Sequence, residues 1–549
     1  MKYIFVSGGV ISGIGKGTTA ASIAFLLKSA GLRVAPIKFE NYLNLDAGTI
    51  NPIEHGDPFL CEDGTEADMD IGTYEKFLNE DMGKDNFVTM GRIYQSVIER
   101  ERRFEYNGED VEAIPHLTNE IIGRIKNLGR LKKADIVIIE LGGTAGEYQN
   151  VFYYEASRIM TLANRGDVLH IHVSYVPTPR HLGEPKTKPT QLSVRTLNSL
   201  GIQPDFVITR SEKYLDQRRR ERFALFCNMR PEDIISNPDL SSVYEIPLVL
   251  HKQNLEERIL QKLGLKLRKP DLKSWEKLVE KIHTKKDKGI EIAIVGKYFG
   301  TGDYQLKDSY AALFDAIDHA CYSIGVGVKT KWVDAEKVER EGAEIIGKPD
   351  GIIVPIGWGE RGSEGMIAGA SYARKHLVPY LGLCYGMQLA VIAYARDILG
   401  WQDADTTENN SKTTHPVIDL IPKQKEYMER RAYGGTMRLG AWDATVKKGT
   451  RAFEIYQQAG SFASQTQHTS ERHRHRYEFN NKYAKDFENN GLVISARSVA
   501  ENLVEIIELP KDVHPFYMGT QGHPEYKSRP LSPHPIFLAF IKATSENKK

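Results

Sequence analysis

The sequence predicts an α/β protein with two parallel-sheet domains, and three observations lead to this prediction. Residues 1–265 alternate short apolar runs with helical patterns, which is typical of a parallel sheet covered by helices. Residues 266–288 are charged and polar, which indicates an interdomain linker. A second α/β pattern begins after this stretch, at residues 290–295. We therefore predict domains at 1–265 and 289–545, joined by the linker.

The composition is that of an ordinary globular protein, and it excludes some partners. Of the 549 residues 41% are hydrophobic, and 73 Lys plus Arg nearly balance 72 Asp plus Glu. No overall basic charge exists to attract nucleic acid, so we expect no such partner. The cysteines are far apart, which fits a reducing compartment; they are Cys61, Cys227, Cys321 and Cys384. Because we find neither a signal peptide nor an apolar run of membrane-spanning length, we expect a cytoplasmic protein without membrane partners.

A glycine-rich loop at residues 7–19 follows the first predicted strand, at residues 3–6, and leads into a predicted helix at residues 20–28. In such a loop, backbone N–H groups and the helix N-terminus face an anion, and Lys16 adds a positive charge. The spacing departs from the usual phosphate-loop pattern, because the preceding glycine is one residue further away and Gly17 follows the lysine. The loop predicts a phosphate cradle, with a glycine-rich structural turn as the alternative.

Acidic residues occur where a nucleotide site needs them. Residues 62–70 are densely acidic, and a predicted strand at residues 134–139 ends in Glu140. Carboxylates bind Mg²⁺, and ligands of α/β sheets bind at the C-terminal ends of strands. We therefore expect Asp70 and Glu140 to hold the metal, although a solvated acidic loop is the plainer interpretation of residues 62–70.

A short segment combines cations with hydrogen-bonding side chains. It consists of Lys186, Thr187, Lys188, Pro189, Thr190 and Gln191. A solvated turn is the simplest interpretation. Beside a phosphate cradle, however, this combination predicts a second clamp for a polyphosphate.

The second half contains a G-x-C-x-G sequence, Gly382-Leu383-Cys384-Tyr385-Gly386, after the apolar run 376–381. This pattern predicts a nucleophile elbow, in which a strand ends, the chain turns sharply, and a helix begins, here at Met387. A thiol needs a base and an orienting group, and Gln521-Gly522-His523-Pro524-Glu525 offers both. The spacing of His523 and Glu525 predicts one extended segment with both side chains on the same face. An unreactive buried cysteine is the alternative.

Two charged sequences in this half are open to more than one interpretation. Residues 471–478 alternate charged side chains, which predicts a strand with one charged face that suits a carboxylate or a phosphate. Residues 434–440 resemble a flexible loop that carries one anion-binding residue, Arg438. Taken alone, each is better explained as surface than as a site.

Residues 382–386 and 521–525 resemble class I glutamine amidotransferases, which release ammonia from glutamine through a thioester. With the cradle, residues 62–70, Ile114-Pro115-His116, residues 140–144 and the clamp, they fall in the order seen in the CTP synthase family, over residues 2–543. The resemblance implies an N-terminal P-loop-type amidoligase domain, a C-terminal class I glutamine amidotransferase domain, and commonly a homotetramer. It implies ATP and Mg²⁺, phosphorylation of the 4-oxygen of UTP, and displacement of that phosphate by ammonia channelled from the glutaminase. GTP is implied as an allosteric activator.

By position, the resemblance also implies a role for each matching residue. The catalytic residues would be Cys384, His523 and Glu525 in the glutaminase and Lys16 and Lys38 in phosphoryl transfer. The ATP-binding residues would be Gly13, Ile14, Gly15, Lys16, Gly17, Thr18, Asp70 and Asp239, with Mg²⁺ at Asp70 and Glu140. The UTP- and CTP-binding residues would be Ser12, Glu112, Glu147, Gln149, Lys186, Thr187, Lys188, Pro189, Thr190, Gln191 and Arg222. Glutamine would bind at Gly357, Cys384, Tyr385, Gln388, Glu408 and Arg476, and GTP activation would be linked to Trp358, Arg361 and Arg438.

The sequence departs from the family pattern at five positions. Glu112 replaces a Gln and Gln149 replaces a Glu in the pyrimidine-side pocket, which exchanges hydrogen-bond donors for acceptors. Glu147 replaces an Asp, and Gly13 replaces a Ser in the cradle. Ile356 replaces a Gly, and a β-branched residue suits a positive φ badly. If the loop requires such a φ to aim an oxyanion-hole N–H, we expect glutamine hydrolysis to be slow or to depend on an activator.

Two further functions remain open at this stage. The first is a paralogous ligase that aminates another carbonyl on a phosphorylated, pyrimidine-like substrate, which Glu112 and Gln149 motivate. The second is a nucleotide-dependent switch or filament scaffold with a vestigial amidotransferase half. The intact Cys384, His523 and Glu525 argue against the second.

Overall fold

A computed structural model describes residues 1–51, 56–284, 286, 289–298, 300–301, 304–305, 307–422, 424–462 and 466–548. The chain forms two compact units. Unit 1 comprises Met1–Asp46 and Asp70–Ile282, and unit 2 comprises Ala47–Met69 and His283–Lys549. Residues 47–69 thus pack with the second unit, although the sequence predicts them inside a continuous first domain at 1–265. None of the described helices is both long and apolar enough to cross a membrane.

Unit 1 contains a parallel sheet, as predicted, in which seven strands are formed by the described residues. In sheet order they are β5 (Phe87–Thr89), β2 (Val34–Glu40), β6 (Ile136–Leu141), β1 (Lys2–Gly9), β7 (Val168–Tyr175), β8 (Phe206–Ser211) and β9 (Ile234–Pro238). The helices are α1 (Lys16–Ser29), α3 (Met69–Leu78), α4 (Met90–Arg102), α5 (Thr118–Leu131), α6 (Val151–Ala163), α7 (Lys188–Ser199), α8 (Gln217–Cys227), α9 (Ile246–His251), α10 (Leu255–Lys262) and α11 (Lys273–His283). The predicted strands at 3–6 and 134–139 correspond to β1 and β6.

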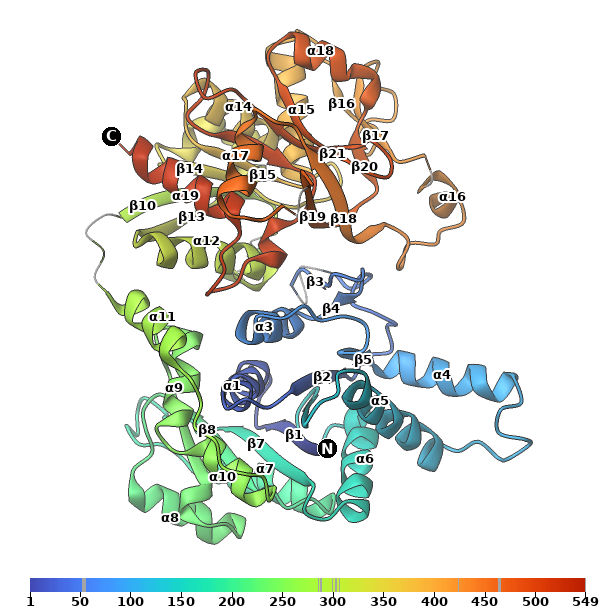
Figure 1. The fold of residues 1–549 in the computed structure, drawn as a ribbon, viewed down its shortest axis with the longest axis vertical. Coiled ribbons are helices and arrows are strands. Elements are labelled where there is room, and N and C mark those ends of the chain that lie inside the picture. The colour runs from blue at the N-terminus through green and yellow to red at the C-terminus, as the bar shows by residue number, and fades with distance from the viewer. Residues whose placement is uncertain are drawn as a thin grey trace. The chain divides into compact units, whose positions relative to one another are not determined.

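Side chains alternate between the two faces of this sheet along each strand. On one face, Tyr3 and Phe5 of β1 pack with apolar residues of α4, α5 and α6. Helices α1 and α9, which are not part of this core, pack against each other (Figure 1). Because every strand of the sheet is parallel, the C-terminal ends of the strands meet at one edge, where the candidate nucleotide residues follow β1, β2 and β6.

The predicted linker is partly folded. Its residues 273–283 form α11, and Trp275 of this helix is buried against Phe25 and Phe77 and donates a hydrogen bond to the carbonyl of Tyr244. Residues 285, 287 and 288 of the predicted linker lie outside the described residues. The linker and domain boundaries therefore stay predictions.

Unit 2 contains a mixed sheet, to which the described residues contribute nine strands. In sheet order they are β13 (Gly327–Asp334), β10 (Gly289–Gly296), β14 (Gly351–Val354), β15 (Tyr380–Leu383), β23 (Tyr517–Thr520), β22 (Val504–Glu508), β21 (Val493–Ser498), β18 (Arg438–Val446) and β19 (His468–His475). The pairs from β13 to β23 are parallel, and those from β23 to β19 are antiparallel. The α/β class is thus confirmed, and half of this sheet is antiparallel.

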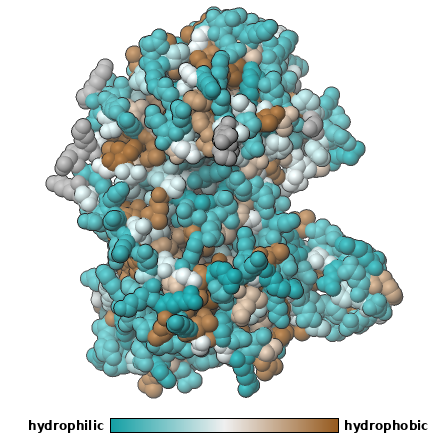
Figure 2. Space-filling view, in the orientation of Figure 1, coloured by the Kyte–Doolittle hydropathy of each residue, from teal (hydrophilic) through white to brown (hydrophobic). Residues whose placement is uncertain are grey.

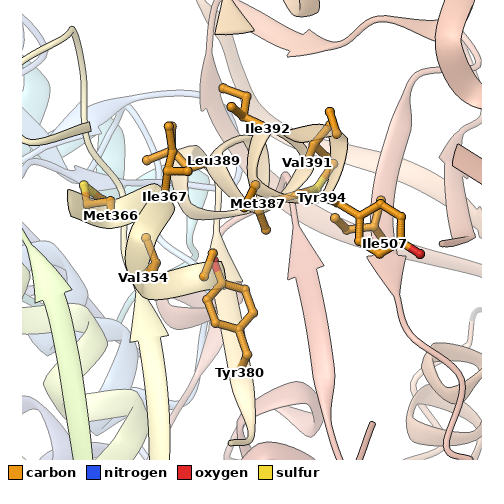
Figure 3. Packing of buried hydrophobic residues seen from close by; sticks show 14 of the residues in the cluster. Val354, Met366, Ile367, Tyr380, Met387, Leu389, Val391, Ile392, Tyr394 and Ile507 are labelled. Carbon is orange, nitrogen blue, oxygen red and sulfur yellow. The ribbon is translucent and has the colours of Figure 1, made fainter. Parts of the chain in front are cut away.

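Helices cover both faces of the unit 2 sheet. They are α12 (Ala311–Ile324), α13 (Ala335–Glu341), α14 (Ser363–Lys375), α15 (Tyr385–Asp397), α16 (Gln424–Glu429), α17 (Arg451–Gln458), α18 (Ala484–Asn489) and α19 (Pro535–Asn547). Apolar residues of α14 and α15 pack over the strands on one face, as Figure 3 shows for Met366, Met387 and Tyr380. On the other face, α12, α17 and α19 share a second core with Leu383 and Ile356. Both ends of the strand that precedes the elbow are therefore fixed by packing.

Candidate active site

The G-x-C-x-G sequence forms the predicted elbow between β15 and α15. Cys384 has φ 52° and ψ −101°, a conformation that L-residues rarely adopt, and its N–H donates to the carbonyl of Thr520 at 2.7 Å. A Cβ on Gly386 would lie 1.9 Å from the carbonyl oxygen of Val354, so only glycine allows this close approach. The helix begins at Tyr385, two residues earlier than predicted. The turn leaves the thiol at the C-terminal end of β15, beside the helix N-terminus.

His523 and Glu525 follow β23, the strand that pairs with β15. Nδ1 of His523 and Oε1 of Glu525 lie 2.7 Å apart, and both side chains are buried. The prediction of one extended segment is wrong, because His523 precedes a 3-10 helix at Pro524–Lys527 that contains Glu525. The tight turn still brings the carboxylate back to the ring, so the base and its orienting group meet as expected.

The electrostatics of His523 favour the charged ring. Burial acts to lower the pKa of His523, but Glu525 and Cys384 outweigh it and raise the pKa to about 10. Nε2 of His523 is buried and has no hydrogen-bond partner among the described residues. Since Nδ1 is taken by Glu525, Nε2 is the nitrogen that remains for the thiol or for a substrate. The arrangement places the Cys384 thiol beside an imidazolium ring that a carboxylate holds.

Neighbouring side chains complete the surroundings of the thiol. Gln521 donates from Nε2 to Sγ of Cys384 at 3.5 Å, and Gln388 donates to Oε1 of Gln521 at 3.1 Å. Sγ of Cys384 also lies 3.8 Å from the carbonyl oxygen of Arg474. Sequence reasoning assigned no role to Gln521, although it stands in the same motif as His523.

Three side chains fix the loop that carries Gly357, because they form hydrogen bonds with the backbone N–H and carbonyl groups of Gly359. The N–H of Gly359 donates to Glu408 at 2.9 Å, and its carbonyl accepts from Lys297 at 2.7 Å and from the Tyr385 hydroxyl at 2.9 Å. Burial lowers the pKa of Lys297 to about 8 and raises the pKa of Glu408. Glu408 and Tyr385 were predicted glutamine-site residues, whereas Lys297 was missed.

Ile356 does not have the positive φ that the expectation of slow hydrolysis presupposes. Its side chain is 3% exposed and belongs to the same apolar core as Leu383 and Tyr310. The β-branched side chain is accommodated because it packs into this core. The structure therefore removes the stated reason for slow glutamine hydrolysis.

Of the two charged sequences of this half, residues 471–478 are largely buried, so their interpretation as surface is wrong, whereas residues 434–437 form a partly exposed turn that leads into β18. Arg438 begins β18, is 5% exposed, and donates to Glu505 at 2.7 Å; it does not stand on a flexible loop. Arg472 and Arg474 on β19 are buried, and acidic residues of the 47–69 segment neutralise them. Alternation along a strand does not distinguish a solvated charged face from one covered by a segment of opposite charge.

Of the other predicted residues of this half, Arg476 lies between β19 and the short strand β20 (Tyr477–Phe479), and Trp358 and Arg361 lie in the loop after β14. Arg476 donates to Gln424, to the carbonyl of Tyr433 and to the Thr436 hydroxyl. The Trp358 ring lies under the Arg474 guanidinium, 5.3 Å from the ring centre. The Arg361 guanidinium bonds to Glu336 and to the carbonyl of Lys297. Trp358 and Arg361 thus flank the loop of Gly357, while Arg438 lies in its own buried ion pair.

In unit 1 the predicted cradle joins β1 to α1. Gly13 and Gly15 have φ of 69° and 79°, and Gly15 is the N-cap of α1. A Cβ on Gly17 would lie 2.2 Å from a carboxylate oxygen of Asp70, so this carboxylate reaches the cradle. Lys16 donates to the carbonyl of Gly143 at 2.7 Å, beyond the end of β6. The first turn of α1 and the ends of two strands therefore converge at the predicted cradle.

Lys38, at the C-terminal half of β2, joins the two predicted metal residues. It forms ion pairs with Asp70, with Glu40 at 2.9 Å and with Glu140 at 3.7 Å. Oε1 of Glu140 is buried and has no hydrogen-bond partner among the described residues, while Oε2 accepts from Tyr74 at 2.9 Å. Burial raises the pKa of Glu140 to about 7. No group of three or more described His, Cys, Asp and Glu side chains forms a complete metal site. However, Oε1 of Glu140, which accepts no hydrogen bond from the described residues, and the nearby Asp70 fit a cation that is also held by phosphates.

Asp239, the remaining predicted ATP residue, follows β9. It accepts from Arg210 at 3.1 Å, and Arg210 also donates to the carbonyls of Asn237 and Pro238. A Cβ on Gly15 would lie 4.0 Å from Nε of Arg210, so this arginine borders the cradle. Arg210 was missed because it stands alone at a strand end, without a motif.

The predicted clamp surrounds the start of α7. Lys186 pairs with Glu184, and Gln191 donates to the Thr187 hydroxyl at 3.1 Å. Thr190 is buried and accepts from Ser174 at 3.0 Å. Arg222 is exposed on α8, whose Arg219 reaches Glu184 and the carbonyl of Pro185. Of the cations of the clamp, Lys186 is thus paired with a protein carboxylate, Glu184.

The substituted pocket residues lie at the surface of unit 1. Glu112 and Gln149 are exposed, and no hydrogen bond or ion pair joins either side chain to the clamp among the described residues. Glu147 accepts from the N–H of Thr144 at 2.7 Å and from Asn41 at 3.3 Å. Ser12 is exposed beside Gly13 in the cradle. Of the substitutions, only Glu147 is fixed by local bonds.

Comparison with known proteins accounts for both halves of the chain. The protein-family model for the CTP synthase N-terminus matches residues 2–265, and the protein-family model for class-I glutamine amidotransferases matches residues 305–543. The CTP synthase of Caldanaerobacter subterraneus subsp. tengcongensis is 47% identical, over 99% of this chain and 98% of that protein. Those of Pyrococcus abyssi and Nostoc punctiforme are each 45% identical, over 100% and 99% of this chain and 98% and 96% of theirs. Two matching domain models and full-length relatives at this identity show that the chain belongs to the CTP synthase family.

Proposed function

We propose that the two sites divide the reaction of this family between them. The protein is a glutamine-hydrolysing carbon–nitrogen ligase that converts UTP into CTP and uses ATP as a substrate. The elbow site in unit 2 would release ammonia from glutamine, and the cradle in unit 1 would activate UTP. The observation that carries this division is the Cys384, His523 and Glu525 geometry in one unit and the cradle in the other.

In the elbow site, the Cys384 thiolate attacks the carboxamide carbon of glutamine. The tetrahedral oxyanion is stabilised by N–H groups at Tyr385 and Gly357, and His523 passes its proton to the departing ammonia. Water then hydrolyses the thioester, which releases glutamate and restores the thiol. Glu525 holds the imidazole throughout. Gly357, Gln388, Glu408 and Arg476 would position the amino acid, since Arg476 offers a cation and Glu408 a carboxylate.

In the cradle, ATP would bind at Gly13, Ile14, Gly15, Gly17, Thr18, Asp70 and Asp239. Lys16 and Lys38 would stabilise the charge of the γ-phosphoryl group while it moves to the 4-oxygen of UTP. Asp70 and Glu140 would hold Mg²⁺, which neutralises phosphate charge when bound. Ammonia then attacks C4 of the ring and phosphate leaves, which gives CTP.

UTP, and CTP as product or inhibitor, would bind through its triphosphate to the clamp. The residues are Lys186, Thr187, Lys188, Pro189, Thr190, Gln191 and Arg222, with Ser12, Glu112, Glu147 and Gln149 toward the pyrimidine. The phosphates would replace Glu184 as the partner of Lys186, because a polyphosphate carries more negative charge than one carboxylate.

Three finer points belong to the same proposal. GTP would act through Trp358 and Arg361, which flank the loop of Gly357, and Arg438 would serve it only by supporting β18. We also propose a homotetramer, as the family commonly forms, and a cytoplasmic location. The loop geometry supports the first of these points; the other two follow from the family.

The substrate experiment compares acceptors and nitrogen donors. Purified protein is incubated with ATP, Mg²⁺ and ammonia against UTP, dUTP, UMP and non-nucleotide carbonyl compounds, and then with glutamine in place of ammonia. We expect CTP from UTP with both donors. Turnover with another acceptor alone would support the paralogous ligase, and ATP binding without ligation would support a switch or scaffold. The full-length identity to CTP synthases favours neither alternative.

A further inference from the structure

Residues 47–69 pack with unit 2, although they fall within the range that the N-terminal family model matches. We therefore ask what this segment contributes to unit 2. The segment contains the short strands β3 (Phe59–Leu60) and β4 (Glu66–Ala67), which pair with each other. Its residues 52–55 are outside the described part. Three of its acidic residues, Asp57, Glu62 and Glu66, and the carbonyl of Leu60 contact strand β19 of the glutamine amidotransferase sheet.

Two buried arginines of β19 bind this segment. Arg472 donates from Nε to Glu62 at 2.9 Å and from Nη1 to the carbonyl of Leu60 at 2.9 Å. Arg474 donates from Nε to Glu66 at 2.7 Å and from Nη1 to Asp57 at 3.3 Å. Burial acts to lower the pKa of Arg474, but Asp57 and Glu66 outweigh it and raise the pKa above its usual value. A buried guanidinium depends on such partners, since an unpaired buried charge is strongly unfavourable.

The backbones of the same two arginines contact the catalytic residues. The carbonyl of Arg472 accepts from the N–H of His523 at 2.8 Å, and the carbonyl of Arg474 lies 3.8 Å from Sγ of Cys384. Each arginine thus links an acidic residue of the segment, through its side chain, to a triad residue, through its main chain. A shift of Arg472 would move His523, and a shift of Arg474 would move the carbonyl that lies beside the Cys384 thiol.

Tyr526 provides a second link from the segment to His523. Its ring stacks on the His523 ring with centroids 5.2 Å apart and 29° between the planes. Its hydroxyl donates to Asp57 at 2.6 Å and lies 3.2 Å from the carbonyl of Pro58. Asp57 is therefore bound by both the arginine beside Cys384 and the tyrosine that covers His523.

We propose that residues 56–69 of this segment are a positioning element of the glutaminase site, and that Asp57 is their central residue. Asp57 holds Arg474 and Tyr526 together, and these fix the mutual geometry of Cys384 and His523. Asp57 is a positioning residue because it reaches the triad only through these two side chains. The inference rests on the proposed assignment of the glutaminase triad.

The test compares Asp57→Asn with wild type in full-length protein, with glutamine and with ammonia as nitrogen donors. Asparagine keeps the size and an acceptor for Tyr526 but loses the charge that balances Arg474. We expect the kcat of glutamine-dependent CTP synthesis to fall about 10- to 100-fold, because small errors in triad geometry are costly. We expect the KM for glutamine and the ammonia-dependent kcat to stay within about twofold.

Two further variants separate positioning from general stability. Tyr526→Phe removes the bond to Asp57 but keeps the stacked ring, and the double variant with Asp57→Asn should lose less than the product of the single losses. Asp57→Glu should recover part of the activity, since it restores the charge. Asp397→Asn is the matched control: it removes a carboxylate paired with Arg374 and Lys375, at the far end of the helix that starts beside Cys384 and about 20 Å from it.

The outcomes decide between distinct failures. The proposal is overturned if Asp57→Asn retains glutamine-dependent activity within twofold of wild type, or if both nitrogen donors lose activity equally. An equal loss in Asp397→Asn would also overturn it. Failure of the triad assignment would appear separately, as glutamine-dependent synthesis that survives in Cys384→Ala.

Discussion

The elbow site and the phosphate cradle differ in how completely the protein forms them. Cys384, His523 and Glu525 are 2%, 0% and 5% exposed, and their bonds are made with one another, with Gln521 and with neighbouring main chain. In the cradle and clamp, by contrast, the cations pair with the protein's own acceptors: Lys16 with a carbonyl, and Lys38 and Lys186 with carboxylates. In the elbow site the side chains hold one another at fixed positions. In the cradle and clamp the lysines can exchange their protein acceptors for phosphates.

This contrast follows from the two kinds of chemistry. Covalent catalysis requires a nucleophile and base at fixed positions, so burial and dense bonding are favourable. Phosphoryl transfer requires positive charge that moves from protein partners to phosphates when nucleotides bind. Figure 2 shows mainly hydrophilic residues on the face in view, with hydrophobic residues in separate groups, as expected for surfaces that keep charged groups hydrated. The predictions below test whether the two sites are as separable as this comparison implies.

Replacement of Cys384 by alanine should have the largest effect. Without the thiol no thioester forms, so glutamine-dependent CTP synthesis should fall by about 10⁴-fold or more. Ammonia-dependent synthesis should stay within about threefold of wild type, because unit 1 is unchanged. Steady-state CTP formation with each donor measures both; an equal loss with ammonia would show that the sites are not separable.

Glu525→Gln should lower glutaminase kcat by on the order of 10³- to 10⁴-fold, because the imidazole loses the carboxylate that orients and charges it. The raised pKa of His523 means that the pair stabilises the fold fully below about pH 6.5 and loses this stabilisation as pH rises through about 10. The variant lacks this contribution, so its Tm should fall less than that of wild type between pH 7 and pH 10. A parallel fall in Tm would contradict the assignment of this ion pair.

Lys16→Ala should reduce CTP synthesis about 10²- to 10³-fold with either nitrogen donor, since the γ-phosphoryl group loses a cation. Hydrolysis of glutamine measured without nucleotides should change less than about twofold. The matched control is Lys28→Ala, which removes a lysine from the other end of the same helix, where it pairs with Glu80. Similar losses in both lysine variants would point to damage of α1 instead of the cradle.

Ile356→Gly should have the smallest effect on catalysis. Because Ile356 is not held at positive φ, glycine relieves no strain, and glutaminase kcat should change less than about threefold. The lost side chain should still destabilise unit 2 by about 3 kcal/mol or more, through the cavity it leaves. Glutamate release and denaturant unfolding measure the two effects; a gain in kcat of tenfold or more would revive the idea of a strained loop.

Local motifs were predictable from the sequence, whereas burial of charge was not. The elbow, the His523 and Glu525 pair, and the cradle each depend on a few residues close in the chain, and the structure forms all three. Arg472 and Arg474 were interpreted as a solvated face because their partners, Glu62 and Glu66, stand about 400 residues away in the sequence. Contacts at that separation leave no periodic signal.

Single residues with a structural task were also missed. Lys297 and Arg210 each bind main-chain carbonyls beside a site, and neither belongs to a spaced motif. The mixed sheet of unit 2 and the folded helix α11 in the predicted linker have the same explanation, because both depend on tertiary packing. Trp275, for example, reads as part of a charged stretch but fills a pocket between Phe25 and Phe77.

The transfer of nitrogen from one site to the other is the central claim, and isotope labelling tests it most directly. Wild type and Cys384→Ala are each given ATP, Mg²⁺, UTP, glutamine labelled with ¹⁵N in its side-chain amide, and unlabelled ammonium chloride, and the CTP is analysed by mass spectrometry. The account predicts ¹⁵N in the 4-amino group of CTP from wild type and only ¹⁴N there in CTP from Cys384→Ala. Labelled CTP from Cys384→Ala, or a wild type that incorporates only ¹⁴N, would contradict it.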